Sequence, residues 1–499
     1  MDQMNLFELM YDQFKIDRNK KLKIIELFAG YGSQSMALEL LGVPFDHHFV
    51  CEFDKYAIDT YNAFHKTNFE TSDVAKIKAE DLNIVDKDKY TYMMTYSFPC
   101  TDLSLAGKRQ GMEKGSGTRS GLLWEVERLL IELNGNLPQV LIMENVPQVI
   151  SANGWKEWCY FLESLGYKNY CEILNAKDYY IPQNRQRAFM VSILGDYCYN
   201  FPRKMKLKYR LKDFLEPKVD EKYYLSEKQI IQISNWKAQQ DPLKNIDKEK
   251  VICPTLTARG AGLDHSGMIL INEATIKGYA EAHEGDGIDI NRPHQKRGVV
   301  QKGMIQTIKT QPDDIGVVVK EEYIDTYEYS KSEKFMNNKD RFQLNNNISS
   351  TLLASGHNNG LVVKVGNYSP SGHNADGFVE DNLEPRVIGG IGEKKSNGGT
   401  QWYQQDRVYS GDGIAMRHPA NLPGGSYNYQ FGLRIRKLTP RECFRLMGVT
   451  DDYIDRVRVS NAQQYKQAGN SIVVTVLMAI FGKLLDVDYE SKIKEIYNK

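Results

Sequence analysis

Long apolar runs, paired cysteines and a surplus of charge are all missing from this 499-residue chain. It has no stretch of 18 or more apolar residues, and its first residues lack the basic-then-apolar pattern of a secretion signal, so we expect no membrane span and a cytoplasmic protein. The 7 cysteines are scattered and never spaced as CxxC, which argues against a disulfide framework and against a zinc site, and we expect no metal. A net charge of +0 removes the simplest electrostatic case for nucleic-acid binding, although a locally basic face is compatible with it.

The composition that remains is typical of a globular enzyme. Hydrophobic residues make up 41% of the chain and charged residues 26%, which excludes a disordered or fibrous protein. The length allows about three domains of roughly 150 residues each and a sizeable core.

The N-terminal part begins with a strand, a glycine turn and a helix. The apolar run at 23–28 breaks at 29–32, where Gly30 and Gly32 lie, and apolar residues resume at helical spacing over 33–41. This order predicts the first unit of a doubly wound nucleotide-binding sheet. Ser35 replaces the third glycine of the dinucleotide fingerprint, and no Gly-Lys-Ser/Thr follows, so neither a nicotinamide cofactor nor a P-loop phosphate is favoured.

Two carboxylates follow, each at the end of an expected strand. Glu52 ends the run at 49–51, where an acidic side chain can accept hydrogen bonds from a ribose diol, and Asp73 ends a third candidate strand, where it could accept from an adenine amino group. Taken singly, each could equally be a helix N-cap or an exposed loop residue. Together with the aromatic-glycine turn, and without a phosphate cradle, they favour S-adenosylmethionine.

Pro99 and Cys100 end the next apolar run, at 92–98, and a polar segment with several glycines follows through residue 121. A thiol where a sheet ends and a glycine-hinged loop begins is well placed to attack a substrate that the loop then covers. A buried core position is the commoner role of a cysteine. The interpretation of Cys100 therefore depends on its surroundings.

Further polar residues are expected beside Cys100. Residues 139–143 form a predicted strand that ends in Glu144, at the same edge of the sheet. Farther on, Gln183, Arg185 and Arg187 alternate with their neighbours in an extended segment, so we expect them to face one way. Two arginines and a glutamine on one face suit an anionic, oxygen-rich partner.

On these residues and their order, the chain resembles the cytosine-5 DNA methyltransferase family of bacterial or phage type, over about residues 23–195 and 434–482. Phe53 stands where many members have tryptophan, a change that should keep an aromatic face against the cofactor. The matching motifs are Phe28-Ala29-Gly30-Tyr31-Gly32, Glu52-Phe53-Asp54-Lys55-Tyr56, Asp73, Pro99-Cys100, Glu144-Asn145-Val146, Gln183-Asn184-Arg185-Gln186-Arg187, Arg436-Lys437-Leu438-Thr439-Pro440-Arg441-Glu442 and Gly469-Asn470-Ser471-Ile472.

The resemblance implies an α/β fold: a doubly wound, Rossmann-like S-adenosylmethionine-dependent methyltransferase domain with an inserted, irregular, β-rich target-recognition domain. It implies methyl transfer to C5 of a flipped-out cytosine in a specific double-stranded DNA sequence. In that reaction Cys100 would attack C6, and Glu144 would bind the exocyclic amine and protonate N3. Arg187 would hold O2 and, with Arg185, fix the loop and Glu144 in place.

The resemblance also implies a set of binding residues. Phe28 would stack on the adenine of S-adenosylmethionine, and Glu52 would bind its ribose. The other expected cofactor residues are Ala29, Gly30, Gly32, Ser33, Phe53, Asp73, Val74, Pro99, Leu122, Asn470 and Ile472. The expected DNA or substrate contacts are Ser104, Lys108, Arg109 and Gln183, although a solvated surface charge is an equal alternative for each loop cation.

The middle of the chain, 201–432, changes to short apolar runs separated by Gly, Asn, Asp and Ser, which indicates an irregular β-rich region. A weak repeat of paired apolar runs begins near residues 254, 306 and 350, and represents either recurring hairpins or recognition loops for the major groove. A helix is expected at Thr439-Pro440 and an apolar one at 472–485. We therefore expect a catalytic segment at 1–197, a target-recognition domain at 198–455 and a returning catalytic segment at 456–499.

The expected partner is double-stranded DNA, in a monomer associated with the nucleoid, and the sequence leaves open whether a cognate restriction endonuclease exists. An RNA (tRNA) cytosine-5 methyltransferase would use the same residues, but the recognition region of about 230 residues argues against it. A non-catalytic DNA-binding regulator on the same fold is the other alternative. The presence of Cys100, Glu144 and Arg187 argues against that regulator.

Overall fold

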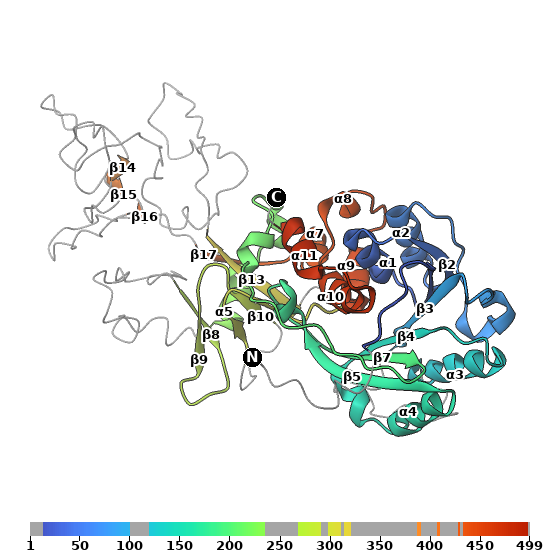
Figure 1. The fold of residues 1–499 in the computed structure, drawn as a ribbon. Coiled ribbons are helices and arrows are strands. Elements are labelled where there is room, and N and C mark those ends of the chain that lie inside the picture. The colour runs from blue at the N-terminus through green and yellow to red at the C-terminus, as the bar shows by residue number, and fades with distance from the viewer. Residues whose placement is uncertain are drawn as a thin grey trace, which may run out of the picture.

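The computed structural model (Figure 1) describes residues 13–99, 119–234, 268–290, 298–310, 314–320, 387–390, 407–409, 428–429 and 433–497. A larger part carries helices on both sides of a central sheet, and a smaller part built of short strands lies beside it (Figure 1). Cys100, Ser104, Lys108 and Arg109 lie outside the described residues.

The described residues of the larger part form a 6-stranded sheet in the order β2-β1-β3-β4-β7-β5. The pairs β1–β2, β1–β3 and β3–β4 are parallel, whereas β7 runs antiparallel to both β4 and β5. The strands are β1 (Lys21–Leu27), β2 (Phe45–Cys51), β3 (Tyr90–Tyr96), β4 (Val140–Asn145), β5 (Tyr167–Asn175) and β7 (Gln186–Leu194). This order confirms the expected doubly wound α/β fold.

Helix boundaries follow local capping signals. The first helix spans Ser33 to Leu41, as the sequence predicts, and Gly42 ends it in the left-handed conformation at φ 72°. Thr439 and Glu442 form a capping box at the start of α7. The helices are α1 (Ser33–Leu41), α2 (Lys55–His65), α3 (Leu123–Glu132), α4 (Trp155–Ser164), α5 (Glu227–Ile233), α7 (Pro440–Arg445), α8 (Asp451–Ile454), α9 (Asn461–Asn470), α10 (Val474–Leu485) and α11 (Tyr489–Tyr497).

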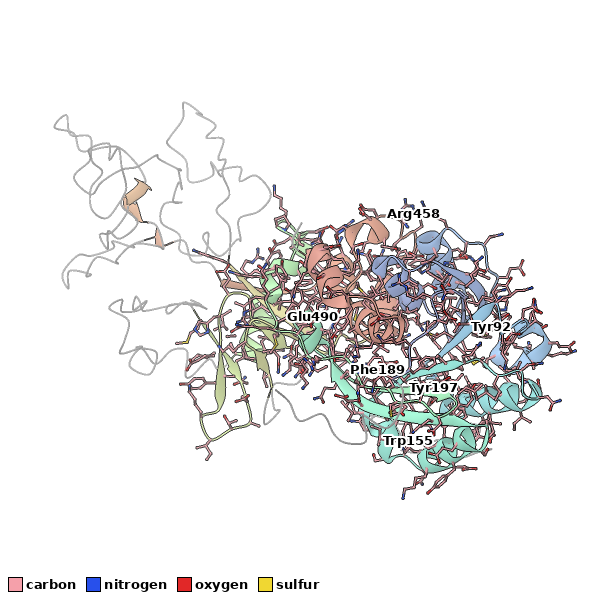
Figure 2. The ribbon with its side chains drawn as sticks, viewed as in Figure 1. Tyr92, Trp155, Phe189, Tyr197, Arg458 and Glu490 are labelled. Carbon is pink, nitrogen blue, oxygen red and sulfur yellow. The ribbon has the colours of Figure 1, made fainter. Side chains whose placement is uncertain are left out.

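Alternate side chains of the sheet enter two separate hydrophobic cores. On β1, Ile24 packs into the core that contains α1 and α10, whereas Ile25 packs into the core that contains α3 and α4. Phe189 on β7 belongs to the first core and Trp155 on α4 to the second (Figure 2). Because both faces are covered, a central strand such as β4 is buried along its whole length.

The returning C-terminal segment completes the first core. Phe444 and Met447, at and just after α7, pack into it together with nearly all of α10. The stretch Asn461–Leu485 has the length and composition of a membrane span, but 83% of its most apolar window is buried inside the protein. Within the described chain this stretch therefore packs as core.

The predicted strand ending at Asp73 is wrong. Among the described residues, Asp73 instead caps a 3-10 helix, Val74–Lys76, by accepting a hydrogen bond from Ala75 N at 3.1 Å. A short acidic side chain that bonds its own backbone competes with strand pairing. The segment is still held next to β2, because Ser72 N donates to Glu52 O at 2.9 Å.

The smaller part contains a 4-stranded sheet in the order β11-β10-β13-β17 among its described residues. A hairpin of β8 and β9 lies next to it. A parallel pair of β6 and β12 connects this part to the larger one. The strands are β6 (Gln183–Asn184), β8 (Ile269–Asn272), β9 (Tyr279–Ala282), β10 (Gly287–Asp289), β11 (Val300–Gln301), β12 (Ile305–Gln306), β13 (Ile315–Lys320) and β17 (Leu433–Lys437). Three further strands, β14 (Val387–Gly390), β15 (Arg407–Tyr409) and β16 (Asn428–Tyr429), form a separate 3-stranded sheet.

The described copy of the sequence repeat does not form a hairpin. Its second run, 316–319, lies in β13, which pairs with β10 and β17. Its first run, 306–309, overlaps β12 only at Gln306, and β12 pairs with β6. Similar apolar runs can therefore take different partners, because side-chain pattern alone does not choose the neighbouring strand. The other two copies lie wholly or partly outside the described residues.

Candidate active site

Parallel strands β1, β3 and β4 bring their carboxyl ends to one edge of the sheet. Leu27 pairs with Tyr96, and Tyr96 pairs with Met143. Phe28, Ser97 and Glu144 therefore follow at the same level on neighbouring strands. This edge is where ligands bind in open α/β sheets.

The Glu144 carboxylate is fixed from two sides. Its Oε1 lies 3.0 Å from Nε of Arg187 on β7, and its Oε2 accepts a hydrogen bond from Ser97 Oγ at 2.5 Å. The residue is only 5% exposed, so its orientation is set by these partners rather than by solvent. Within the described part of the chain, Arg187 Nη2 makes no hydrogen bond, while Nη1 donates to Gln186 O at 2.8 Å.

The segment that leads to Cys100 is anchored by the neighbour of Glu144. Asn145 Nδ2 donates to Phe98 O at 3.0 Å, and Asn145 Oδ1 accepts from Val146 N at 2.8 Å. Pro99 is the last described residue before Cys100. The amide of Asn145 thus connects the end of β4 to the chain directly preceding the expected nucleophile.

The glycine turn after β1 is joined to Glu52. Gly30 N donates to Glu52 Oε2 at 2.8 Å, and Asp54 N donates to Oε1 at 2.7 Å. Burial raises the pKa of the Glu52 carboxyl, although these backbone hydrogen bonds oppose the rise. Phe28 adopts a positive φ of 58°, which is unusual for a residue with a side chain and typical of functional turns.

The residues at this turn fit an adenosine group. A methyl group built on Gly30 would meet nothing within 4 Å, so the space in front of the turn is open. Phe53, next to Glu52, is 77% exposed and offers an uncovered aromatic face. Open space, an aromatic ring and a fixed carboxylate are together the chemistry that an adenine and a ribose diol require.

The two glycines of the turn serve different purposes. A methyl group on Gly32 would lie 2.4 Å from His65 Nε2 and 2.6 Å from the Tyr61 ring. Gly32 therefore permits the close packing of α2 behind the turn. Gly30 alone faces the open side.

Comparison with known proteins agrees with this geometry. The model of the family described as C-5 cytosine-specific DNA methylase matches residues 22–486. The chain belongs to this family. The resemblance inferred from the motifs is thereby confirmed, and with it the activity class, a methyltransferase acting on cytosine in DNA.

Individual relatives include bacterial and phage enzymes. The chain is 32% identical over 319 residues to the orphan methyltransferase M.SssI of Spiroplasma monobiae, covering 49% of this chain and 81% of that protein. It is 27% identical over 504 residues to the orphan methyltransferase M.SPRI of Bacillus phage SPR, covering 93% and 98% of the two chains. Among solved structures, the Dnmt2 methyltransferase of S. pombe is 17% identical, with a TM-score of 0.46 and coverage of 94% and 99%.

Two predicted site residues of this methylase are turned toward the protein interior. Gln183 is 0% exposed, with Nε2 donating to Leu446 O at 2.7 Å and Oε1 accepting from Ile308 N at 3.2 Å. Arg185 is also buried. The expectation that both share an anion-binding face with Arg187 is wrong, because the β6–β12 pairing encloses them, and Gln183 has no surface for DNA.

Arg185 has a different role in the structure. Its Nη2 donates to Gly469 O at 3.0 Å and to Ser471 O at 2.7 Å, and its Nη1 donates to Ile308 O at 3.0 Å. It therefore fixes the turn that carries Asn470 rather than the Glu144 carboxylate. The guanidinium is a positioning group at the edge of the expected cofactor site.

The remaining predicted cofactor residues differ in exposure, and their contacts with S-adenosylmethionine stay predictions. The carbonyl of Val74 accepts from Arg128 Nη2 at 3.1 Å. Buried side chains are Ala29, Ser33, Val74 and Ile472; half-buried ones are Phe28, Glu52, Asp73, Pro99 and Leu122; exposed ones are Phe53 and Asn470.

Ser97 is a candidate site residue to which sequence reasoning assigned no role. It lies between the end of β3 and the Pro99-Cys100 pair, and its hydroxyl contacts Glu144 across the sheet. The sequence distance of 47 residues between the two hides this contact. Ser97 lies inside the run predicted as a strand, 92–98, and only the structure ends β3 at Tyr96 and leaves the Ser97 hydroxyl at the edge beside Glu144.

Proposed function

We propose that this methylase acts on a cytosine flipped out of double-stranded DNA, with Cys100 as the nucleophile at C6. Cytosine C5 is a poor nucleophile until the ring's aromaticity is broken, and addition of a thiolate at C6 makes C5 an enamine carbon. The observation that supports this assignment is the fixed Glu144 carboxylate, held by Arg187 and Ser97 directly beside the chain that enters Cys100.

Glu144 and Arg187 have complementary roles in the proposal. Glu144 first takes up a proton from solvent; in this protonated form it delivers the proton to N3, where negative charge develops as sulfur adds to C6, and its other oxygen accepts a hydrogen bond from the exocyclic amine. Nη2 of Arg187 reaches O2 of the base, the other atom that gains charge. The hydroxyl of Ser97 holds the carboxylate at the correct angle. Loss of the C5 proton and of the thiolate then restores the aromatic ring.

The same edge of the sheet holds the cofactor. S-adenosylmethionine, when bound, supplies an electrophilic methyl group on sulfur. Phe28 and Phe53 present aromatic faces to the adenine, Gly30 allows close approach, and the ionised carboxylate of Glu52 accepts hydrogen bonds from the ribose. Asn470, on the turn held by Arg185, lies on the methionine side.

DNA recognition is proposed for the inserted β-rich part that follows residue 197, in a cytoplasmic monomer. Side chains from both ends of the predicted 198–455 range, among them Tyr199, Phe214 and Phe444, pack into the catalytic core, which supports a recognition surface in the residues between those ends. Ser104, Lys108 and Arg109 follow Cys100 in sequence and are proposed DNA contacts. A cognate endonuclease would be a further partner.

Bisulfite sequencing of a plasmid exposed to the protein tests the function and reads out the target sequence. We expect methylation by the unmodified protein and by Cys171→Ala, which removes an exposed cysteine on β5. We expect none by Cys100→Ala, with binding of duplex DNA retained. Methylation by Cys100→Ala would overturn the mechanism.

A second comparison separates the acid from an ordinary surface carboxylate. Glu144→Gln should lose nearly all methyl transfer, whereas Glu163→Gln, an exposed glutamate on α4, should not. Competition between duplex DNA and tRNA for tritium transfer from labelled cofactor then decides the substrate. Preferential labelling of tRNA would replace the DNA proposal by the RNA alternative.

A further inference from the structure

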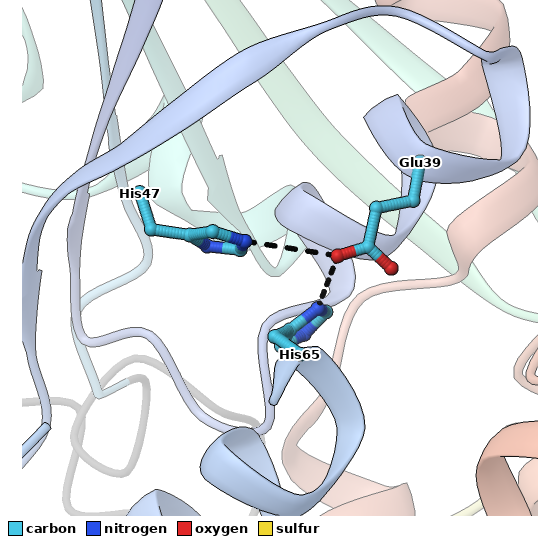
Figure 3. Close-up of side chains that lie close together, drawn as sticks. All are labelled: Glu39, His47 and His65. Carbon is cyan, nitrogen blue, oxygen red and sulfur yellow. Dashed lines mark hydrogen bonds and ion pairs between the residues drawn. The ribbon is translucent and has the colours of Figure 1, made fainter. Parts of the chain in front are cut away.

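Two histidines and a glutamate meet where α1, β2 and α2 pack together, behind the glycine turn. Glu39 Oε1 lies 2.8 Å from His65 Nδ1 and 3.7 Å from His47 Nε2 (Figure 3). The three possible ligand atoms lie within 4.8 Å of one another. In Figure 3 both rings point toward the same carboxylate oxygen.

The hydrogen bonds of His65 define which of its nitrogens carries a proton. Nε2 lies 3.1 Å from Tyr31 O, and a carbonyl oxygen can only accept, so Nε2 carries hydrogen. In the neutral ring Nδ1 then has a lone pair, and that lone pair faces Glu39. A backbone carbonyl that orients the far nitrogen is the usual outer partner of a metal-binding histidine.

The surroundings of His47 lead to the same conclusion. Its Nδ1 lies 2.8 Å from Tyr61 OH and 3.1 Å from Ser35 Oγ. Both hydroxyls donate their protons to Glu26 Oε2, each at 2.5 Å, so they accept a hydrogen bond from Nδ1. The lone pair of neutral His47 is therefore on Nε2 and also faces Glu39.

Glu39 itself is oriented by an outer partner. Its Oε2 accepts a hydrogen bond from Tyr453 OH, which leaves Oε1 directed at the two imidazoles. Two nitrogen lone pairs facing a carboxylate oxygen repel each other unless a proton or a cation lies between them. The arrangement thus supplies two neutral imidazoles and one carboxylate to a common point.

We propose that Glu39, His47 and His65 bind a divalent transition-metal cation, with zinc(II) the best-matched ion. Imidazole and carboxylate ligands bind zinc at about 2.0–2.1 Å, which places tetrahedral ligands about 3.3 Å apart. The two histidine–glutamate distances of 2.8 and 3.7 Å lie on either side of this value, and the two imidazole nitrogens, which lie within 4.8 Å of each other, would move to this separation on binding. The side chains of His47 and Glu39 are 19% and 27% exposed, so an ion has a route from solvent. Cysteine spacing could not reveal this site, because its ligands come from three separate elements.

The site would strengthen the support of the cofactor turn. His65 bonds the carbonyl of Tyr31 and packs directly behind Gly32. A cation on its other nitrogen would connect this turn to β2 and to the end of α1. We therefore expect a structural ion that raises the unfolding temperature by several degrees and takes no part in methyl transfer.

The test is metal binding by the full chain without an affinity tag, after chelator treatment. We expect about one zinc ion per chain by mass spectrometry of the dialysed protein, and an intense visible spectrum of tetrahedral geometry with cobalt(II). His47→Gln and Glu39→Gln should each weaken zinc binding by about 100-fold or more. Circular dichroism establishes that each variant is folded.

His48→Gln is the matched control. His48 is the next residue of the same strand, its ring faces the opposite side, and Nε2 lies 2.9 Å from Leu82 O. It should bind zinc as the unmodified protein does. Zinc binding by folded His47→Gln at full affinity would overturn the proposal. Failure of the unmodified chain to take up zinc or cobalt would also overturn it, and would mean that a proton occupies the centre of the cluster.

Discussion

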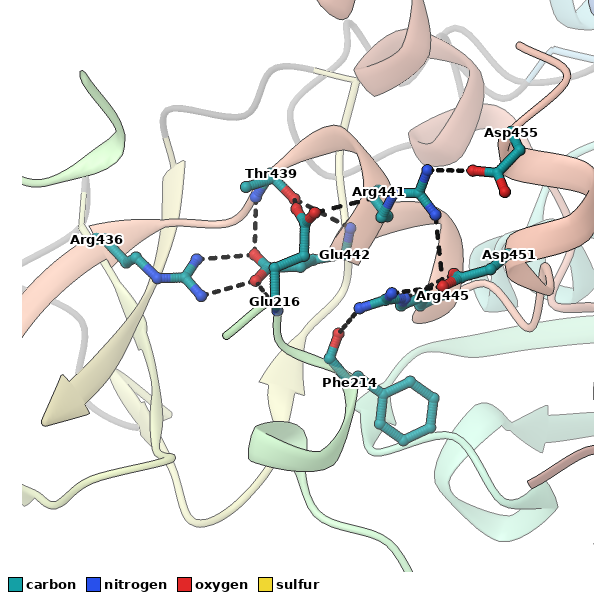
Figure 4. Close-up of polar contacts among 9 residues, drawn as sticks. All are labelled: Phe214, Glu216, Arg436, Thr439, Arg441, Glu442, Arg445, Asp451 and Asp455. Carbon is teal, nitrogen blue, oxygen red and sulfur yellow. Dashed lines mark hydrogen bonds and ion pairs between the residues drawn. The ribbon is translucent and has the colours of Figure 1, made fainter. Parts of the chain in front are cut away.

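Removing the charge of Glu442 should destabilise the junction between the two parts of the protein. Glu442 on α7 accepts hydrogen bonds from Arg436 Nη1 at 2.8 Å and Nη2 at 2.7 Å (Figure 4). It also accepts from Thr439 N at 2.8 Å and from Glu216 N at 2.7 Å. Arg436 is 2% exposed and Glu442 0%, so water cannot replace any lost partner.

The expected magnitude follows from that burial. In Glu442→Gln the side chain keeps its size, but the guanidinium of Arg436 becomes a buried charge without a counter-ion. Breaking a buried ion pair in this way costs about 3–5 kcal/mol. Arg436 lies on β17 of the smaller sheet and Glu442 in the core of the larger part, so the loss acts on their connection.

Urea unfolding, followed by fluorescence and circular dichroism, measures the effect. The control is Glu221→Gln, which removes the partner of Arg434 on the same strand. The Arg434–Glu221 pair is exposed, and its loss should cost no more than about 1 kcal/mol. Arg436→Met introduced into Glu442→Gln should recover part of the stability, because it removes the unpaired charge. If Glu442→Gln lowers the unfolding midpoint no more than Glu221→Gln, the reasoning is refuted.

Three further predictions concern the active edge. Ser97→Ala should lower kcat by about tenfold or more, because a hydrogen bond to the Glu144 carboxylate is lost, and unchanged turnover in a tritium-transfer assay would contradict this. Affinity for S-adenosylmethionine should fall as the pH drops through the raised pKa of Glu52, because the carboxylate that accepts from the ribose becomes neutral. Calorimetric titration at a series of pH values measures this loss of affinity, which should begin at a higher pH than for an ordinary glutamate. If the affinity of the unmodified protein depends on pH as little as that of Glu52→Gln, the prediction is wrong. Gly32→Ala should lower the unfolding temperature more than Gly30→Ala. At either position an alanine would be held at a positive φ, which costs about 1–2 kcal/mol of stability. Only at Gly32 would the added methyl group also overlap an imidazole nitrogen, His65 Nε2, 2.4 Å away. Equal unfolding temperatures in calorimetry would refute that distinction.

Sequence reasoning predicted the strands that meet at this edge of the sheet because its signals are local. Strand runs, the glycine turn and the cap at Thr439 each depend on a few neighbouring residues, and parallel strands must bring their carboxyl ends to one edge. Asp73 shows the limit of such signals. An acidic residue after an extended segment can end a strand or cap a helix, and the local pattern is the same in both cases.

By itself, the sequence determined the doubly wound fold, the family and the residue types at the expected active edge, because hydrophobic periodicity and the order of motifs can be read without knowing which residues are in contact. Only the tertiary structure decided which side chains meet. It turned Gln183 and Arg185 inward through a two-residue strand pairing, and it joined Ser97 to Glu144 across the sheet. It also brought His47 and His65 to one oxygen of Glu39. Such contacts depend on packing between distant segments, and no local pattern of side chains specifies them.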